Sequence, residues 1–210
     1  MVTVRIREIF SSLNGEGKYA GHPTTFIRLS GCPFNCSYCD TLYAKNSGKK
    51  MSIDKIMAEV NKLGNKCVCI TGGEPLIQND TMSLVYELLS FSYIVSIETS
   101  GLVEIEEDGY ARTFNYTMDV KCPSSGVSDS NVYANLSRLK SYDEVKFVIV
   151  DSQDLEFAKT VLKKYPTKAQ VIYSPVNNNL DVAKMIAESL INKDIQGKLG
   201  LQLHKILNIK

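Results

Sequence analysis

The sequence lacks any apolar stretch long enough to cross a bilayer, and residues 1–8 lack the apolar segment of a secretory signal. It has almost no net charge, with 24 Lys and Arg against 23 Asp and Glu, so no global field marks a nucleic-acid or membrane binder. Repeats, low-complexity tracts and proline-rich linkers are also missing. These absences favour a cytoplasmic protein that acts on a small molecule.

A disulfide framework is also unsupported, because six cysteines in 210 residues without a secretory signal fit a reducing compartment better. The length and the 44% hydrophobic content suit one globular domain with an ordinary core. No second domain is required.

Strand-like and helix-like patterns alternate from about residue 24 to the end, which predicts βα units and a parallel sheet. The apolar runs predict strands at 25–30, 67–71, 94–99, 116–121, 145–150, 170–173 and 199–204. Helical periodicity predicts helices at 53–63, 81–89, 154–165 and 180–192, the first ending at Gly64 and the third with Ser152 as a candidate N-cap.

One interval breaks this alternation, because residues 101–115 carry an acidic cluster at 104–108 and no apolar period. We expect no helix there, and we read the acidic cluster as a solvated face. About six βα units in a short chain favour an open, abbreviated (β/α)6-type partial TIM barrel, since a closed eight-stranded barrel typically needs about 250 residues. Chemistry should then gather at the carboxyl ends of the strands.

Three of the cysteines lie within eight residues, in Cys32-Pro-Phe-Asn-Cys36-Ser-Tyr-Cys39. Gly31 before them and Pro33 between them allow the loop to curl, so the three sulfurs could bind one [4Fe–4S] cluster. The motif supplies no fourth thiolate, so one iron of the cluster would remain open to a substrate.

The other three cysteines decide whether that iron stays open. Cys67 and Cys69 lie in an apolar run that reads as a buried strand, where free cysteine behaves as a small hydrophobe. Cys122 is the remaining candidate for a fourth ligand, in a closed zinc or iron–sulfur site. That alternative is a non-catalytic metal module.

About thirty residues after the cysteine loop comes Thr71-Gly-Gly-Glu-Pro75. A bare Gly-Gly-Glu-Pro would ordinarily be a turn, but its two glycines would also let a ligand approach a strand end. Together with the cysteine loop, this segment resembles the radical S-adenosylmethionine (SAM) superfamily. The resemblance implies a [4Fe–4S] cluster, SAM bound to the open iron through its methionine amino and carboxylate groups, and a 5′-deoxyadenosyl radical that abstracts hydrogen from substrate.

A narrower resemblance covers nearly the whole chain. Phe10-Ser-Ser-Leu-Asn-Gly-Glu-Gly17, Gly21-His-Pro23, Phe26-Ile-Arg-Leu-Ser-Gly-Cys32, Cys39-Asp-Thr-Leu-Tyr-Ala44 and Gln202-Leu-His-Lys205 look like the 7-carboxy-7-deazaguanine synthases. The resemblance implies a lyase of queuosine and 7-deazapurine biosynthesis, a tRNA-modification pathway. Its substrate would be 6-carboxy-5,6,7,8-tetrahydropterin, which loses ammonia to give 7-carboxy-7-deazaguanine while SAM is regenerated.

The same resemblance implies Mg2+, a homodimer, a flavodoxin or ferredoxin-type electron donor, and neither nucleic acid nor membrane as a partner. It implies residues 1–210 as a single radical SAM domain with amino- and carboxyl-terminal extensions that bind substrate. No residue is assigned as a catalytic acid or base, because the cofactor radical carries the chemistry.

The implied sites fall into three groups. The metal ligands are Cys32, Cys36 and Cys39 for the cluster and Thr41 for Mg2+. The SAM contacts are Tyr38, Cys39, Asp40, Gly73, Glu98, Asp119, Val120, Lys121, Ser174, Pro175 and Val176. The substrate contacts are Leu13, Asn14, Gly15, Arg28, Thr71, His204 and the carboxylate of Lys210.

Several of these residues have a plainer interpretation. Tyr38 could contact adenine or simply wedge the cluster loop, and Thr41 alone would read as a turn residue bonding its own backbone. Arg28, among apolar neighbours, needs an anionic partner, which a structural salt bridge would also supply. Asn14 replaces the family's glutamine, one methylene longer, so only backbone contacts carry over there.

The family has a Ser-Pro-Lys-like segment at 119–121, so Lys121 carries over better than Asp119 and Val120. The loop at 174–176 would close over SAM or be a plain loop. Of the two histidines, we assign His22 to structure in a Gly-His-Pro turn, while His204 would end the last predicted strand and face the pterin. A second catalytic alternative is a glycyl-radical activase of the same superfamily, which shares the cysteine spacing.

Overall fold

A computed structural model describes residues 2–105 and 113–210 of the chain. One sheet carries all its strands, in the order β3-β1-β2-β4-β5-β6-β7-β8-β9. The strands are β1 (Thr3–Leu13), β2 (Pro23–Leu29), β3 (Lys49–Ser52), β4 (Cys67–Gly72), β5 (Ile94–Thr99), β6 (Phe114–Val120), β7 (Glu144–Ile149), β8 (Gln170–Pro175) and β9 (Lys198–Leu199). Every pairing from β2 to β9 is parallel, whereas β1 pairs antiparallel with β2 and β3.

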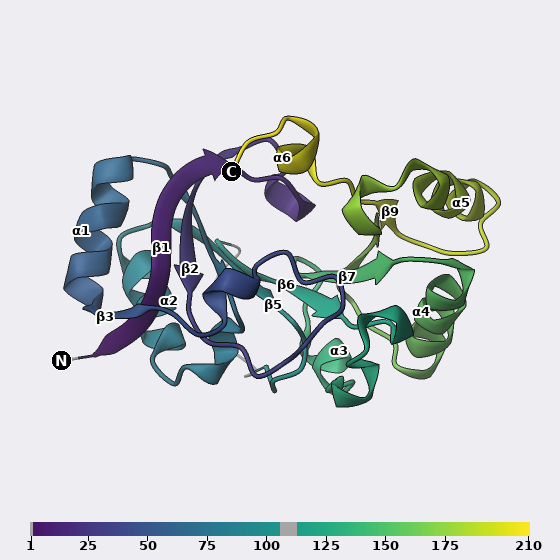
Figure 1. Ribbon diagram of the computed structural model, residues 1–210, viewed down its shortest axis with the longest axis horizontal. Coiled ribbons are helices and arrows are strands. Elements are labelled where there is room, and N and C mark those ends of the chain that lie inside the picture. The colour runs from purple at the N-terminus through teal and green to yellow at the C-terminus, as the bar shows by residue number, and fades with distance from the viewer. Residues whose placement is uncertain (1, 106–112) are drawn as a thin grey trace.

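The helices follow the strands as βα units require. They are α1 (Ile53–Leu63), α2 (Thr81–Ser90), α3 (Asn135–Arg138), α4 (Ser152–Lys164), α5 (Leu180–Ile191) and α6 (Leu203–Ile206). Figure 1 shows α1 and α2 along one half of the curved sheet and α4 and α5 along the other. Within the described residues the edge strands β3 and β9 do not pair, so the barrel is open. The predicted abbreviated α/β barrel is confirmed.

The local sequence explains where several elements end. Gly64 has φ 71 and donates its N–H to Val60 O at 3.3 Å, so a left-handed cap ends α1 as predicted. The predicted cap of α4 is wrong: Asp151 is the N-cap, and its carboxylate accepts from the N–H groups of Gln153 and Asp154. Ser152 is instead the first helical residue.

Two further expectations need correction. The predicted strand at 199–204 is only Lys198–Leu199 paired with β8, and His204 lies in α6 rather than at a strand end. Strands β1 and β3 were not predicted. In the interval 101–115, the described residues 101–105 and 113–115 contain no helix, and residues 106–112 lie outside the described residues.

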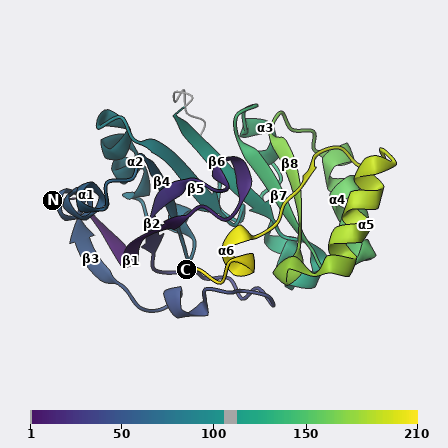
Figure 2. The same cartoon turned by 90° about the horizontal axis from the view of Figure 1, so that it is seen from above.

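The core lies on one face of the central strands, and the opposite face carries the polar residues of the cavity. Side chains such as Ile27, Ile70, Ile97, Met118 and Phe147 are fully or almost fully buried. The carboxyl-terminal helix α6 lies between the β1–β2 half and the β7–β8 half of the sheet in both views (Figures 1 and 2). No helix in the described part of the chain is both long and apolar enough to cross a membrane.

Candidate active site

A cavity of about 250 Å3 opens where the parallel strands end. It is lined by the β1–β2 loop, the cysteine loop, the ends of β4, β5, β6 and β8, and the carboxyl-terminal segment. Of the site residues that the sequence predicted, all line this cavity except Val120. Val120 is buried in the core, so its side chain is not part of the cavity wall.

The cysteine loop is anchored on both sides of its three thiols. Gly31 has φ 105, as a tight curl at this position requires, and donates its N–H to Ala44 O at 2.9 Å. Ser37 is tied to the segment after β6, because its N–H donates to Ser125 O at 3.0 Å and its hydroxyl to Ser124 O at 2.6 Å. The loop therefore bridges β2 and β6 while it holds the thiols at the cavity.

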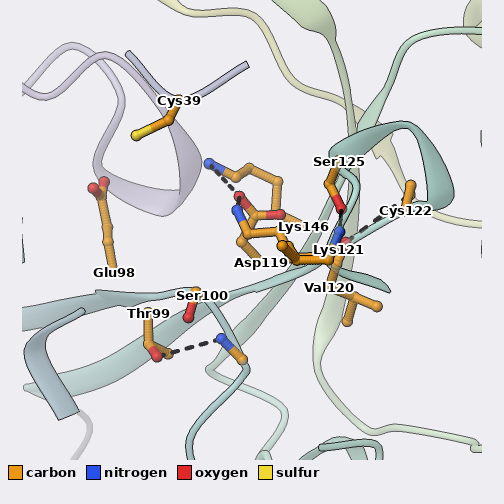
Figure 3. A network of polar contacts seen from close by, with 12 residues as sticks. Cys39, Glu98, Thr99, Ser100, Asp119, Val120, Lys121, Cys122, Ser125 and Lys146 are labelled. Atoms are coloured by element: carbon orange, nitrogen blue, oxygen red, sulfur yellow. Dashed lines mark hydrogen bonds and ion pairs between the residues drawn. The ribbon is translucent and has the colours of Figure 1, made fainter. Parts of the chain in front are cut away.

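The donor set fits a cluster with three protein ligands. Cys32, Cys36 and Cys39 are partly buried and line the cavity, whereas Cys122 is fully buried, donates weakly to Val120 O at 3.9 Å and does not line it. Figure 3 shows Cys122 beyond Lys121 from Cys39. Burial raises the pKa of Cys32 and of Cys36, so metal binding must release their protons.

Cys122 lies apart from the three thiols, so it does not line the cavity with them. Among residues 2–105 and 113–210, no three His, Cys, Asp or Glu side chains are grouped to hold one metal ion. In a cubane, by contrast, each thiolate binds a different iron, so the sulfurs need not meet at one point. Cys67 and Cys69 are buried in β4, as predicted.

The Gly-Gly pair lets the end of β4 meet the end of β2. Gly72 has φ 133, and a Cβ there would lie 2.2 Å from Leu29 O. A Cβ on Gly73 would lie 2.0 Å from Gly31 O. The glycines thus make room for neighbouring backbone as well as for a ligand at the cavity, which Gly73 lines.

Glu74 of the same motif is fully buried and fixes the loop after β5. Its carboxylate accepts from Thr99 Oγ1 at 2.8 Å, from Ser100 N at 2.7 Å and from the Ser100 hydroxyl. Because it lies outside the cavity lining, its role is to hold the strand ends together.

Glu98, at the end of β5, accepts a hydrogen bond from Thr71 Oγ1 at 2.9 Å. Burial raises the pKa of Glu98, and the nearby carboxylate of Glu16 raises it further. In Figure 3 the Glu98 carboxyl group points toward the side of the cavity where Cys39 lies. The predicted SAM residue Glu98 and the predicted substrate residue Thr71 are therefore one hydrogen-bonded pair.

A buried ion network crosses the ends of β6 and β7. Lys121 Nζ lies 3.0 Å from Asp119 Oδ2, and Lys146 Nζ lies 3.8 Å from the same oxygen (Figure 3). Lys146 Nζ also lies 3.0 Å from Glu16 Oε2. Burial opposes the charged form of both lysines, but their carboxylate neighbours outweigh it and raise the pKa of each. Both lysines are therefore cations at the cavity wall.

Two polar atoms at the cavity wall are buried and have no hydrogen-bond partner among residues 2–105 and 113–210: Asp119 Oδ1 and the Tyr38 hydroxyl. Lys121 Nζ lies 6.0 Å from the centre of the Tyr38 ring, and burial raises the pKa of Tyr38. A buried acceptor and a buried hydroxyl call for a polar ligand. A polar cofactor such as SAM fits this wall.

Arg28 is held on the β2 side of the cavity. Its Nε lies 2.9 Å from Glu8 Oε1, and its guanidinium stacks over the rings of Phe10 and Tyr43. Lys210 Nζ also reaches Glu8, at 2.5 Å. Arg28 therefore forms the structural salt bridge that was its alternative interpretation, and it also lines the cavity.

The β1–β2 loop and the carboxyl-terminal segment pack together at the cavity. Asn14 is buried, and its Oδ1 accepts from Glu16 N at 3.2 Å, so its side chain closes a turn. Gly15 O accepts from Leu203 N at 2.9 Å, and the His204 ring packs directly on the Cα of Gly15. Burial lowers the pKa of His204.

Asp40 and Thr41 directly follow the last cysteine of the cluster loop. Thr41 Oγ1 lies 3.9 Å from Cys39 Sγ and makes no side-chain bond to the first turn that follows it, and Asp40 pairs with Lys205 at 3.1 Å. The predicted loop at 174–176 is instead the end of β8 at Ser174 and Pro175 followed by Val176, and all three residues line the cavity. His22 is exposed, and its Nδ1 lies 3.2 Å from Tyr19 O in a turn, which agrees with its assignment to structure.

Among the residues of this site that sequence reasoning missed are Glu16 and Lys146. Glu16 lies in the segment at residues 10–17 that resembles the family, but no role was predicted for it. Lys146 interrupts the apolar strand at 145–150 just as Arg28 interrupts 25–30, and a buried charge of that kind needs a partner. The same signal could therefore have found Lys146.

Comparisons with known proteins agree with this geometry. The model of the Radical SAM superfamily matches residues 26–145. A 7-carboxy-7-deazaguanine synthase of Methanospirillum hungatei is 42% identical over 98% of this chain and 86% of its own length. The one from Chlorobaculum tepidum is 35% identical over 97% and 94%.

Solved structures give the same result. The crystal structure of QueE from Escherichia coli has a TM-score of 0.81 at 25% identity and covers 96% of this chain and 95% of that one. Streptococcus suis SuiB bound to S-adenosylmethionine, at 10% identity, shares the fold alone, with a TM-score of 0.60 over 81% of this chain and 48% of its own.

Fold and site define a radical SAM enzyme. Within that superfamily the chain belongs to the 7-carboxy-7-deazaguanine synthase family, which its relatives match over nearly their whole length. The activase and metal-module alternatives are not favoured.

Proposed function

We propose that the chain converts 6-carboxy-5,6,7,8-tetrahydropterin to 7-carboxy-7-deazaguanine with loss of ammonia, in queuosine and 7-deazapurine biosynthesis. The observation that carries the proposal is one cavity in which three thiols, an unpartnered acid and hydroxyl, and the predicted substrate residues all meet. The names of the relatives support the choice of product.

Cys32, Cys36 and Cys39 would bind the [4Fe–4S] cluster, and the cluster with SAM supplies hydrogen-atom abstraction from an unreactive C–H bond. The wall at the ends of β5, β6 and β8 would hold SAM. Asp119 Oδ1 offers a free acceptor, and Lys121 a cation for an anionic group. Asp40, Gly73, Glu98 and residues 174–176 complete this wall, while Val120 could contribute only through its backbone.

The pterin would occupy the side formed by β1, β2 and the carboxyl terminus. Arg28 would bind the substrate carboxylate through its remaining N–H groups, and the backbone of Leu13, Asn14 and Gly15 would read the ring edge. Thr71, His204 and the carboxylate of Lys210 complete this side of the cavity. Residues 1–210 would act as one domain whose two ends bind substrate.

A magnesium ion would bind beside Thr41. Mg2+ prefers oxygen ligands and often bridges ligand oxygens while keeping several waters, so one hydroxyl and a substrate carboxylate make a partial shell. Beyond the site, we propose a homodimer and a flavodoxin or ferredoxin-type electron donor. A cytoplasmic location remains a prediction from the sequence.

One incubation tests the proposal. Anaerobically reconstituted, reduced protein is given 6-carboxytetrahydropterin, Mg2+ and SAM, and the deazaguanine acid is sought by mass spectrometry. We expect product to form with SAM regenerated. Transfer of deuterium to 5′-deoxyadenosine from a protein glycine rather than from the pterin would instead indicate an activase, and a colourless protein that never cleaves SAM would indicate a metal module. Either result would overturn the proposal.

A further inference from the structure

Glu16 has no assigned role in the reaction, yet it joins three parts of the fold. Its Oε2 lies 3.0 Å from Lys146 Nζ on β7, and its Oε1 accepts from Gln202 Nε2 at 2.7 Å. Its own N–H donates to the Asn14 side chain. One carboxylate therefore links the β1–β2 loop, the opposite half of the sheet and the carboxyl-terminal segment.

The residues beside this link form one side of the cavity. Gly15 O accepts from Leu203 N, and a Cβ on Gly15 would lie 1.9 Å from His204 Nδ1. The His204 ring thus rests directly on the Gly15 backbone. Any shift of Glu16 would move both, because Gly15 is its neighbour in sequence and Gln202 lies two residues from His204.

The charges also favour a fixed geometry. Lys146 is buried among Glu16, Asp119 and Glu98, and its closest carboxylate is Glu16. The attraction to Lys146 and the bond from Gln202 outweigh burial and lower the pKa of Glu16. A buried charge with well-placed partners has little freedom to move, since each partner lost leaves an uncompensated group.

We propose that Glu16 is a positioning residue for the pterin: held by Lys146 and Gln202, it sets the Gly15 backbone and the His204 ring at the substrate side of the cavity. The inference rests on the proposed function, because the pterin is the ligand that this side would bind. Glu16 acts through Gly15 and His204 and needs no contact of its own with the substrate.

The test compares Glu16→Gln with a matched control, Lys198→Met. Lys198 on β9 pairs at 2.8 Å with buried Glu144 on β7, across β8, and neither residue lines the cavity. We expect Glu16→Gln to raise KM for the pterin about tenfold, since a hydrogen bond to a charged group is lost. It should also raise the ratio of 5′-deoxyadenosine to product, and speed hydrogen exchange in residues 202–210.

Lys198→Met should lower thermal stability while leaving KM, that ratio and the exchange of residues 202–210 within about twofold of wild type. If Glu16→Gln behaves in the same way as Lys198→Met, the Glu16–Lys146 pair has only a structural role and the inference is overturned. If wild-type protein makes no product from the pterin, the proposed function fails instead, and the two failures are distinguishable.

A second variant covers the case in which Glu16→Gln does not fold. Gln202→Leu leaves the Glu16–Lys146 pair in place and removes only the link to the carboxyl-terminal segment. We expect KM for the pterin to rise and hydrogen exchange in residues 202–210 to become faster, both by less than in Glu16→Gln. An unchanged KM with unchanged exchange would overturn the inference.

Discussion

Thr71 and Glu98 form a hydrogen bond of 2.9 Å across the carboxyl ends of the neighbouring strands β4 and β5. Burial and the charge of Glu16 raise the pKa of Glu98 above the ordinary value of 4.5. The folded protein therefore holds this proton more tightly than the unfolded chain. The contribution of Glu98 to wild-type stability therefore falls as pH rises from the ordinary pKa through the raised one.

Glu98→Gln should remove this pH-dependent loss of stability, because glutamine stays neutral and still accepts a hydrogen bond from Thr71. We expect the free energy of unfolding of the variant, relative to wild type, to increase between pH 4.5 and pH 8. Urea unfolding of the cluster-free protein at both pH values measures this. Exposed Glu59→Gln is the control, and a difference between Glu98→Gln and wild type that does not change with pH would contradict the prediction.

Cys36→Ala should abolish product. Cys36 is one of three thiols at the cavity, and the described part of the chain offers no fourth thiol there, since Cys122 is buried elsewhere. Iron content and absorption of the reconstituted protein measure cluster loss, and Cys67→Ala is a matched cysteine change away from the cavity. Cluster and product retained in Cys36→Ala would exclude the three-thiolate site.

Thr41→Ala should weaken the response to Mg2+ while the cluster colour stays, because only an oxygen ligand is lost. Activity titrated with Mg2+ measures this, and Thr41→Ser, which keeps the hydroxyl, should restore the response. An identical Mg2+ titration for Thr41→Ala and wild type would show that Thr41 does not bind the ion.

Arg28→Lys should raise KM for the pterin about tenfold, because lysine keeps the charge but loses the planar fork that binds a carboxylate. Glu8 engages only Nε of Arg28 in the contacts described, which leaves the fork for substrate. Steady-state kinetics measure this. Arg138→Lys, which alters an arginine paired with Glu104 away from the cavity, should leave KM unchanged; an equal rise in both variants would refute a carboxylate contact.

The sequence predicted the helices and strands that are specified by residues close together in the chain. The helix at Ile53–Leu63 and the strand at Ile94–Thr99 match the structure residue for residue. The helix has a clear apolar stripe with a glycine cap, and the strand is a short, mostly buried segment rich in β-branched residues. Strand β1 was missed although Val4 and Ile6 are buried with an exposed arginine between them, a period of two that is itself a signal for a half-buried strand.

The predicted strand at 199–204 also failed. Leucines alternate there, but pairing with β8 ends at Leu199, and the chain then turns to bond Gly15 through Leu203. Such a contact spans almost the whole sequence, so no local pattern could predict it. The same holds for the Glu16–Lys146 pair, whose members are 130 positions apart.

The glycines at the end of β4 give the last prediction. Gly72→Ala should destabilise the protein by about 3 kcal/mol or more, since it adds strain at φ 133 and places a Cβ 2.2 Å from Leu29 O. Gly64→Ala is the control: its φ is 71 but nothing lies within 4 Å, so only about 1 kcal/mol should be lost. Denaturant unfolding of the cluster-free proteins compares the two. Equal losses of stability in the two variants would mean that the contact between β4 and β2 can relax at little cost. Gly72 would then be required for ligand binding rather than for backbone packing.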